Sequence, residues 1–169
     1  MTDPLQPSVL RSTLSVDVDA WQRAAERLHA DGDDVVERMR VLAARYPGTD
    51  GRARFELAGA LDSAGHEAEA AAEYEKALAL GLDEEREAQL VIQYASTLRN
   101  LGRHDEAVAL LGSAAPHPTV GAAREVFLAL ALHSAGRPEE ALRTALEALV
   151  PTLPRYRRSV SAYAAALTD

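Results

Sequence analysis

A stretch near the middle of the chain decides the fold, and it reads Tyr94-Ala95-Ser96-Thr97-Leu98-Arg99-Asn100-Leu101-Gly102-Arg103-His104-Asp105-Glu106-Ala107. Its pattern of a large residue, Ala, Leu, Gly and a closing Glu-Ala pair recurs without gaps on both sides. The matching residues are Leu57, Ala58, Leu61, Gly65, Glu69 and Ala70, and then Leu128, Ala129, Leu132, Gly136, Glu140 and Ala141. The steps between the closing alanines are 37 and 34 residues. A repeat of this length predicts an array of stacked structural units.

Each position in the pattern has a physical reason. The large residue, the Ala and the Leu fall at i, i+1 and i+4, on one face of a helix. The Gly ends that helix, because a left-handed backbone costs glycine little. The acidic residues that follow it complement the dipole of a second helix. The closing Ala then lies where the two helices cross, so each copy predicts a helical hairpin.

The pattern predicts four helical hairpins and a final helix. The expected pairs are roughly 18–30 with 34–46, 51–64 with 67–80, 84–100 with 104–114, and 120–135 with 138–150. The first pair is a degenerate copy, in which Trp21 supplies an aromatic residue and Glu37 replaces the closing Ala. The final helix carries an apolar stripe, which suits it to cap the array. The stripe consists of Tyr156, Val160, Tyr163 and Leu167.

These residues resemble the tetratricopeptide repeat, and the best matches are Ala58, Leu61, Gly65, Ala70, Tyr74 and Ala77. The third copy departs from the pattern with Ala145, where a large residue is usual. The resemblance implies an all-α fold: an α-α superhelix, or solenoid, of about four tetratricopeptide hairpins with a C-terminal capping helix. The expected organisation is a flexible tail (1–16) and a single domain (17–169), with repeats at about 18–50, 51–84, 88–121 and 122–153 and the cap at 155–167.

Over residues 18–168 the chain is also similar to a small family of bacterial tetratricopeptide proteins of unassigned function. Residues 95–103 and 153–159 carry this similarity. Members of that family are regarded as interaction proteins that can be dimeric. The resemblance implies no enzyme activity.

Composition narrows the functional classes. The net charge is −8, and an acidic surface disfavours nucleic acid and anionic membranes. The chain has no Cys, which excludes disulfides, thiolate metal sites and a Cys nucleophile. It shows neither an apolar run of membrane-spanning length nor a signal-peptide pattern at Met1 to Leu14. We therefore expect a cytoplasmic protein, and the use of Arg with a single Lys indicates a bacterial source.

No motif predicts catalysis. Neither type of Gly-rich phosphate loop is present, and the acidic run at residues 31–34 lacks the ligand alternation of a calcium loop. The five His residues have no metal-ligand spacing on one helix face, and they are interpreted as surface or groove-rim residues. We expect no catalytic, cofactor-binding or metal-binding residues, no small-molecule substrate, and therefore no enzyme.

The first helix of each tetratricopeptide hairpin lines a concave groove, which predicts where a protein or peptide partner binds. An alternative for Phe55, Val126 and Phe127 is burial between neighbouring repeats. Only Arg99 and Asn100 resemble parts of a carboxylate clamp, so chaperone-tail binding is not predicted. The predicted groove residues are Phe55, Asp62, Gln89, Ile92, Gln93, Ser96, Arg99, Asn100, Val126, Leu130 and His133.

The last helix offers a second surface. Arg155, Arg157 and Arg158 form a basic cluster on an acidic protein, and they are either a solvated cap or a self-association site. In the second case the cluster meets an acidic face, such as residues 83–87, of another copy. The leading hypothesis is thus a peptide-binding adaptor, ahead of a structural homodimer and of an enzyme or sensor. The possible self-association residues are Arg155, Tyr156, Arg158, Tyr163 and Leu167.

Overall fold

The computed structural model describes residues 23–25, 35–45 and 50–168, and within these ranges the regular structure is helical with no strand. The expected tail and most of the expected helix 18–30, including Trp21 and His29, lie outside the described residues. The helices are α2 (Val35–Ala44), α3 (Arg52–Ser63), α4 (Glu67–Leu80), α5 (Glu84–Asn100), α6 (His104–Ser113), α7 (Ala123–Ser134), α8 (Pro138–Leu149), the short 3₁₀ helix η1 (Val150–Thr152) and α9 (Arg157–Ala165).

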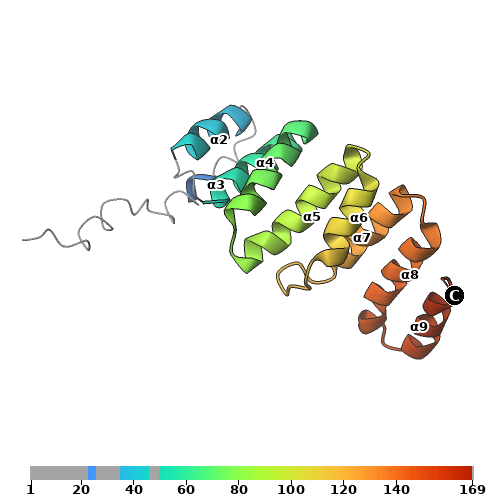
Figure 1. Ribbon diagram of the computed structural model, residues 1–169. Helices are drawn as coiled ribbons and strands as arrows, with labels where there is room; N and C mark the ends of the chain where they lie inside the picture. Colours follow the sequence, from blue (N-terminus) through green and yellow to red (C-terminus); the bar gives the residue numbers. More distant parts are fainter. Residues whose placement is uncertain (1–22, 26–34, 46–49, 169) are drawn as a thin grey trace, which may run out of the picture.

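Three hairpins, α3/α4, α5/α6 and α7/α8, stack one after another along the molecule (Figure 1). Each hairpin contacts the next, and α5 touches α3, α4, α6 and α7. Helix α2 packs on α3 at one end, and α9 packs on α8 at the other. This is the all-α superhelix that the repeat pattern predicts.

The turn inside each hairpin is built in the same way. Gly65, Gly102 and Gly136 have φ values of 78°, 77° and 75°, in the left-handed region that favours glycine. The next residue donates its backbone N–H five residues back, as Arg103 does to the Leu98 carbonyl at 2.9 Å. Such bonds satisfy carbonyl groups that the helix end leaves unpaired. The repeated glycines therefore end α3, α5 and α7 as predicted.

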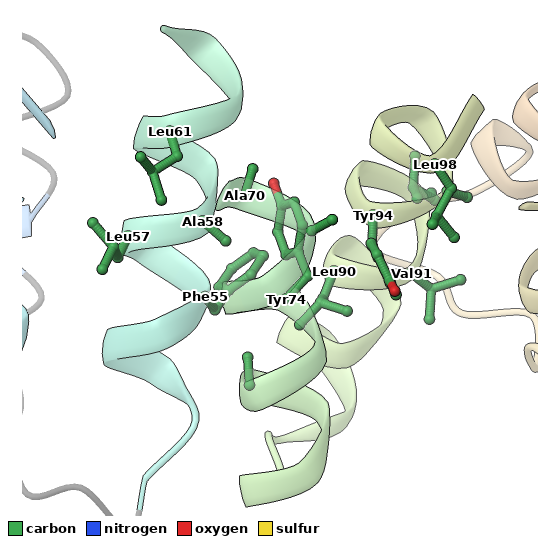
Figure 2. Packing of buried hydrophobic residues seen from close by; sticks show 14 of the residues in the cluster. Phe55, Leu57, Ala58, Leu61, Ala70, Tyr74, Leu90, Val91, Tyr94 and Leu98 are labelled. Atoms are coloured by element: carbon green, nitrogen blue, oxygen red, sulfur yellow. The ribbon is translucent and has the colours of Figure 1, made fainter. Parts of the chain in front are cut away.

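The core is a continuous layer of repeat residues. Ala58, Ala70, Ala95 and Ala107 are at most 1% exposed, so the small repeat positions are where helices approach closely. Tyr74 is fully buried between α3 and α5, beside Phe55 and Tyr94 (Figure 2). Burial is weaker in the third hairpin, where the equivalent alanines, Ala129 and Ala141, are 9% and 7% exposed.

Ala107→Leu is expected to lower the free energy of unfolding by about 1–3 kcal/mol, because a larger side chain overpacks a fully buried helix crossing. Urea denaturation followed by circular dichroism measures the change. Ala109→Leu is the matched control, since Ala109 is exposed on the same helix, and its effect should stay within about 0.5 kcal/mol. Equal effects of the two substitutions would mean that the repeat register is wrong.

Two helix starts differ by more than one residue from the sequence-based expectation. Helix α7 begins at Ala123 rather than near residue 120, because residues 118–122 form turns. Helix α9 begins at Arg157 rather than 155, because Tyr156 has φ 67° and ψ 12°. That left-handed conformation cannot continue a right-handed helix, so the chain enters α9 through a sharp turn after Pro154.

Candidate partner-binding face

The predicted groove residues all lie on the first helices of the hairpins, α3, α5 and α7. These three helices are neighbours, since α3 contacts α5 and α5 contacts α7 (Figure 1). The prediction places side chains from these three repeats on one side of the array. We call this side, with its residues Asp62, Gln89, Gln93, Ser96, Arg99, Asn100, Val126, Leu130 and His133, the first-helix face.

Two predicted groove residues are core residues instead. Phe55 is 5% exposed, and its ring centroid lies 6.4 Å from that of Tyr74 on α4. Ile92 is 9% exposed. The causes differ: Phe55 on α3 packs against Tyr74 of α4, whereas Ile92 lies on α5, which contacts four other helices. The groove assignment of these two residues is therefore wrong, and for Phe55 the alternative of burial holds.

Two further predicted residues hold the array together. The Thr97 hydroxyl lies 3.0 Å from Asp62 Oδ1 and 3.0 Å from the Gln93 carbonyl oxygen, and Thr97 is fully buried. Gln93 Oε1 accepts a hydrogen bond from the Tyr74 hydroxyl at 3.0 Å. Asp62 and Gln93 therefore link α3, α4 and α5 rather than standing free for a partner. Thr97 was missed in the sequence, although a polar residue on the core face of a helix is a signal for such a bond.

Burial governs the acidity of this cluster. It raises the pKa of the Asp62 carboxyl, the Thr97 hydrogen bond opposes this rise, and the charge of Glu67 adds to it. Burial likewise raises the pKa of Tyr74. On the next repeat, burial and a 2.7 Å hydrogen bond to Glu75 Oε1 raise the pKa of Tyr94 to about 12. Both phenols therefore stay protonated at neutral pH and act as hydrogen-bond donors.

Helix α7 presents the open part of the first-helix face. Val126 and Leu130 are 47% and 44% exposed, and His133 is exposed as well. The three residues are spaced by four and three positions, which places them on one side of the helix. They stay open because α9 packs against α8 and η1 rather than over α7. For Val126 the alternative of burial between repeats is therefore wrong, while Phe127 is half-buried.

Arg99 on the neighbouring helix α5 has an unused donor. Its buried Nε has no hydrogen-bond partner among the described residues, while Nη2 donates to Asn100 Oδ1 at 3.3 Å. In the repeat register Arg99 is equivalent to Asp62, and Ala131 is equivalent to Thr97. Thr97 gives Asp62 a hydroxyl partner, whereas the equivalent residue in the next repeat, Ala131, has only a methyl group and cannot bond Arg99. An acceptor from outside the chain would bind this guanidinium group at its Nη atoms, because Nε is buried.

A family model described as tetratrico peptide repeat matches residues 51–167. The chain belongs to the tetratricopeptide repeat family. The match covers α3 to α9. It therefore includes the three hairpins whose first helices carry the first-helix face. No curated protein and no solved structure matched this chain.

The terminal helix of this tetratricopeptide protein exposes two aromatic residues. Tyr156 and Tyr163 are 76% and 74% exposed, while Ala164 is fully buried. The side of α9 that packs on α8 therefore includes Ala164, with Val160 and Leu167 half-buried. Tyr163 was predicted in the same apolar stripe as Val160 and Leu167, but it is 74% exposed, whereas those two residues are half-buried. Leu167 is correspondingly less available for self-association than the sequence suggested.

Arg103 and Arg137 form local ion pairs in the tetratricopeptide array. Arg103 Nε and Nη2 donate to the two carboxylate oxygens of Glu106 at 2.7 and 2.6 Å, and Arg137 binds Glu140 in the same way. Each pair lies at the start of a second helix. Over residues 23–25, 35–45 and 50–168, no group of three metal-ligating side chains gathers at one point. In the same part of the chain no helix has the length and apolar character needed to cross a bilayer.

Proposed function

We propose that this chain is a non-catalytic interaction module that binds a peptide or protein segment on the first-helix face. Tetratricopeptide repeat proteins in general mediate protein–protein interactions, which supports the broad class. The observation that carries the specific site is the open α7 surface, with Val126 47% and Leu130 44% exposed, on a helix that contacts α5, where the buried Nε of Arg99 has no partner among the described residues.

The expected ligand combines two chemistries. Val126 and Leu130 favour an apolar anchor residue, and burying it would exclude water from around Arg99. Arg99 favours an acceptor on the same segment, because a guanidinium group binds carboxylates and carbonyls through several donors. Ser96, Asn100 and His133 add further polar contacts around the anchor. The best match is therefore a segment with an apolar residue close to an acidic or polar one.

The test is a peptide selection followed by affinity measurements. A phage-displayed library of random peptides is selected on the full chain, and enriched peptides are measured by fluorescence anisotropy. Leu130→Arg should weaken their binding about tenfold or more, because the charge cannot be buried against an apolar anchor. Leu142→Arg is the matched control, because Leu142 is 50% exposed on α8, outside the first-helix face, and should leave the affinity unchanged.

Two results would contradict the proposal. One is the absence of any enriched peptide in repeated selections. The other is an affinity that falls equally with Leu142→Arg, or that does not change with Leu130→Arg.

A second candidate function is a structural homodimer that uses the terminal helix. The observation that favours it is the exposure of Tyr156 and Tyr163 at the end of the array. Exposed aromatic residues beside Arg are enriched in protein interfaces. Sedimentation velocity over a range of concentrations tests this candidate, which requires a mass that rises with concentration.

A further inference from the structure

A pocket of about 510 Å³ lies where α4 ends, α5 begins and α6 ends. These three helix ends share one edge of the array, next to the loop that leads into α7 (Figure 1). The apolar side chains of the lining include Leu78, Val91 and Leu110, and the acidic ones are Glu84 and Glu87. We call it the edge pocket. It shares no residue with the first-helix face, so the proposed peptide site leaves it unexplained.

The edge pocket is electrostatically suited to a cation. Glu84 and Glu87 are exposed, and neither forms an ion pair with any described residue. The C-terminal end of α6 adds little negative charge, because Arg124 Nη1 already donates to the carbonyl of its C-cap residue Ala114 at 2.6 Å. The N-terminus of α5 contributes about half a positive charge, which two carboxylates exceed. Because the floor is apolar, the favoured ligand joins a positive charge to an apolar or aromatic body.

One segment of this chain has that chemistry. Residues 153–158, the basic turn, comprise the link between η1 and α9 and the first two residues of α9, and they contain Arg155, Tyr156, Arg157 and Arg158. Arg155 and Arg158 are exposed and form no ion pair within the described part of the chain, while Arg157 Nε donates to the Leu153 carbonyl at 2.6 Å. The turn thus presents two available cations on either side of an aromatic ring.

The backbone holds this ring away from the body of the protein. Tyr156 is the one residue other than glycine with a positive φ among the described residues, and its side chain is 76% exposed. A left-handed backbone is strained for tyrosine, and such strain persists where the surrounding structure enforces it. Here Pro154 on one side and the first turn of α9 on the other restrict the chain.

We propose that the basic turn of one copy docks into the edge pocket of a second copy. Tyr156 lies on the apolar floor, and Arg155 and Arg158 pair with Glu84 and Glu87. Within one chain the two surfaces do not meet, because α9 packs against α8 and η1 at the far end of the array (Figure 1). The inference rests on the second candidate function, self-association, and is independent of peptide binding on the first-helix face.

A charge exchange between the two surfaces tests the contact. The pocket variant carries Glu84→Arg with Glu87→Arg, and the turn variant carries Arg155→Glu with Arg158→Glu. Each variant alone juxtaposes like charges, so its dissociation constant for self-association should rise at least tenfold over that of the wild type. An equimolar mixture of the two variants juxtaposes opposite charges again and should associate. Recovery on mixing cannot come from damaged folding, and circular dichroism checks each variant.

Matched substitutions identify the residues involved. Tyr156→Ala should weaken self-association about tenfold, whereas Tyr163→Ala, which removes an equally exposed ring from α9, should not change it. Glu139→Arg is the charge control on α8, because it makes the change of a single pocket substitution at a position outside the edge pocket. Sedimentation velocity at fixed ionic strength measures all of these variants.

The outcomes of these measurements distinguish the edge-pocket contact from self-association through another surface. If the wild type stays monomeric at every concentration, both self-association and this contact are wrong. If the wild type associates but neither charge variant weakens it, self-association stands and the edge-pocket contact is wrong. Loss of association with Tyr163→Ala and not with Tyr156→Ala would also overturn the contact, because it would place the interface on the outer side of α9.

Discussion

Tyr74→Ala is expected to lower the free energy of unfolding by about 3–5 kcal/mol, the range for removing a buried aromatic side chain. Tyr74 is 0% exposed and lies at the centre of the core, between the hairpin α3/α4 and helix α5 (Figure 2). Its ring centroid is 6.4 Å from that of Phe55 and 5.7 Å from that of Tyr94. The substitution removes both ring contacts and leaves Gln93 Oε1 without its donor. Urea denaturation followed by circular dichroism measures the loss.

Two control variants separate the contribution of the Tyr74 hydroxyl from that of its buried ring. Tyr74→Phe keeps the ring and removes the hydroxyl that Gln93 accepts, so it should cost about 1 kcal/mol. Tyr163→Ala removes a ring that is 74% exposed and should cost about 0.5 kcal/mol or less. Similar losses for Tyr74→Ala and Tyr163→Ala would show that the packing around Tyr74 is not the centre of the core.

Gly51→Ala is expected to destabilise the fold by about 3 kcal/mol, at the upper end of the range for overpacking. A Cβ atom added at Gly51 would lie 2.5 Å from the Ala77 carbonyl oxygen and 2.6 Å from that of Gly81. Both contacts are with backbone atoms, which cannot rotate away as a flexible side chain could. The start of α3 would have to separate from the end of α4. Thermal unfolding and urea denaturation should both record the change.

Gly112→Ala is the matched control, because it makes the same chemical change with no neighbouring atom within 4 Å of the added Cβ. Gly112 lies in α6, where alanine has the better helix propensity by about 1 kcal/mol. The control should therefore be neutral or stabilising. If Gly51→Ala were also neutral, the close approach of α3 to the end of α4 would be contradicted.

The helices could be predicted because their signals are local. Gly65, Gly102 and Gly136 each end a helix through their own backbone conformation, and acidic residues mark the next helix start. These signals act within one or two turns, so they can be read along the chain. The turn at Tyr156 could not be predicted, because tyrosine seldom adopts a positive φ and nothing in its neighbours requires one.

The candidate site could be predicted only in part. Periodicity places Phe55, Ile92 and Val126 at equivalent positions on three first helices, yet Phe55 and Ile92 are buried and Val126 is 47% exposed. Sequence spacing describes the direction of a side chain relative to its own helix. It does not describe which neighbouring helix covers that direction. The open site on α7 exists because no helix beyond α8 covers it.

The sequence by itself determined the hairpin, its length and the places where small residues are needed, because helix periodicity, capping and close helix crossings act over a few residues. Only the tertiary structure decided which members of the repeat stay accessible. It buried Phe55 and Ile92, placed Asp62 within hydrogen-bond distance of Thr97, and left Leu130 exposed. It also formed the edge pocket from three helix ends that are far apart in sequence. These outcomes depend on which helices meet in space, and contacts of that kind are settled by the packing of the whole array.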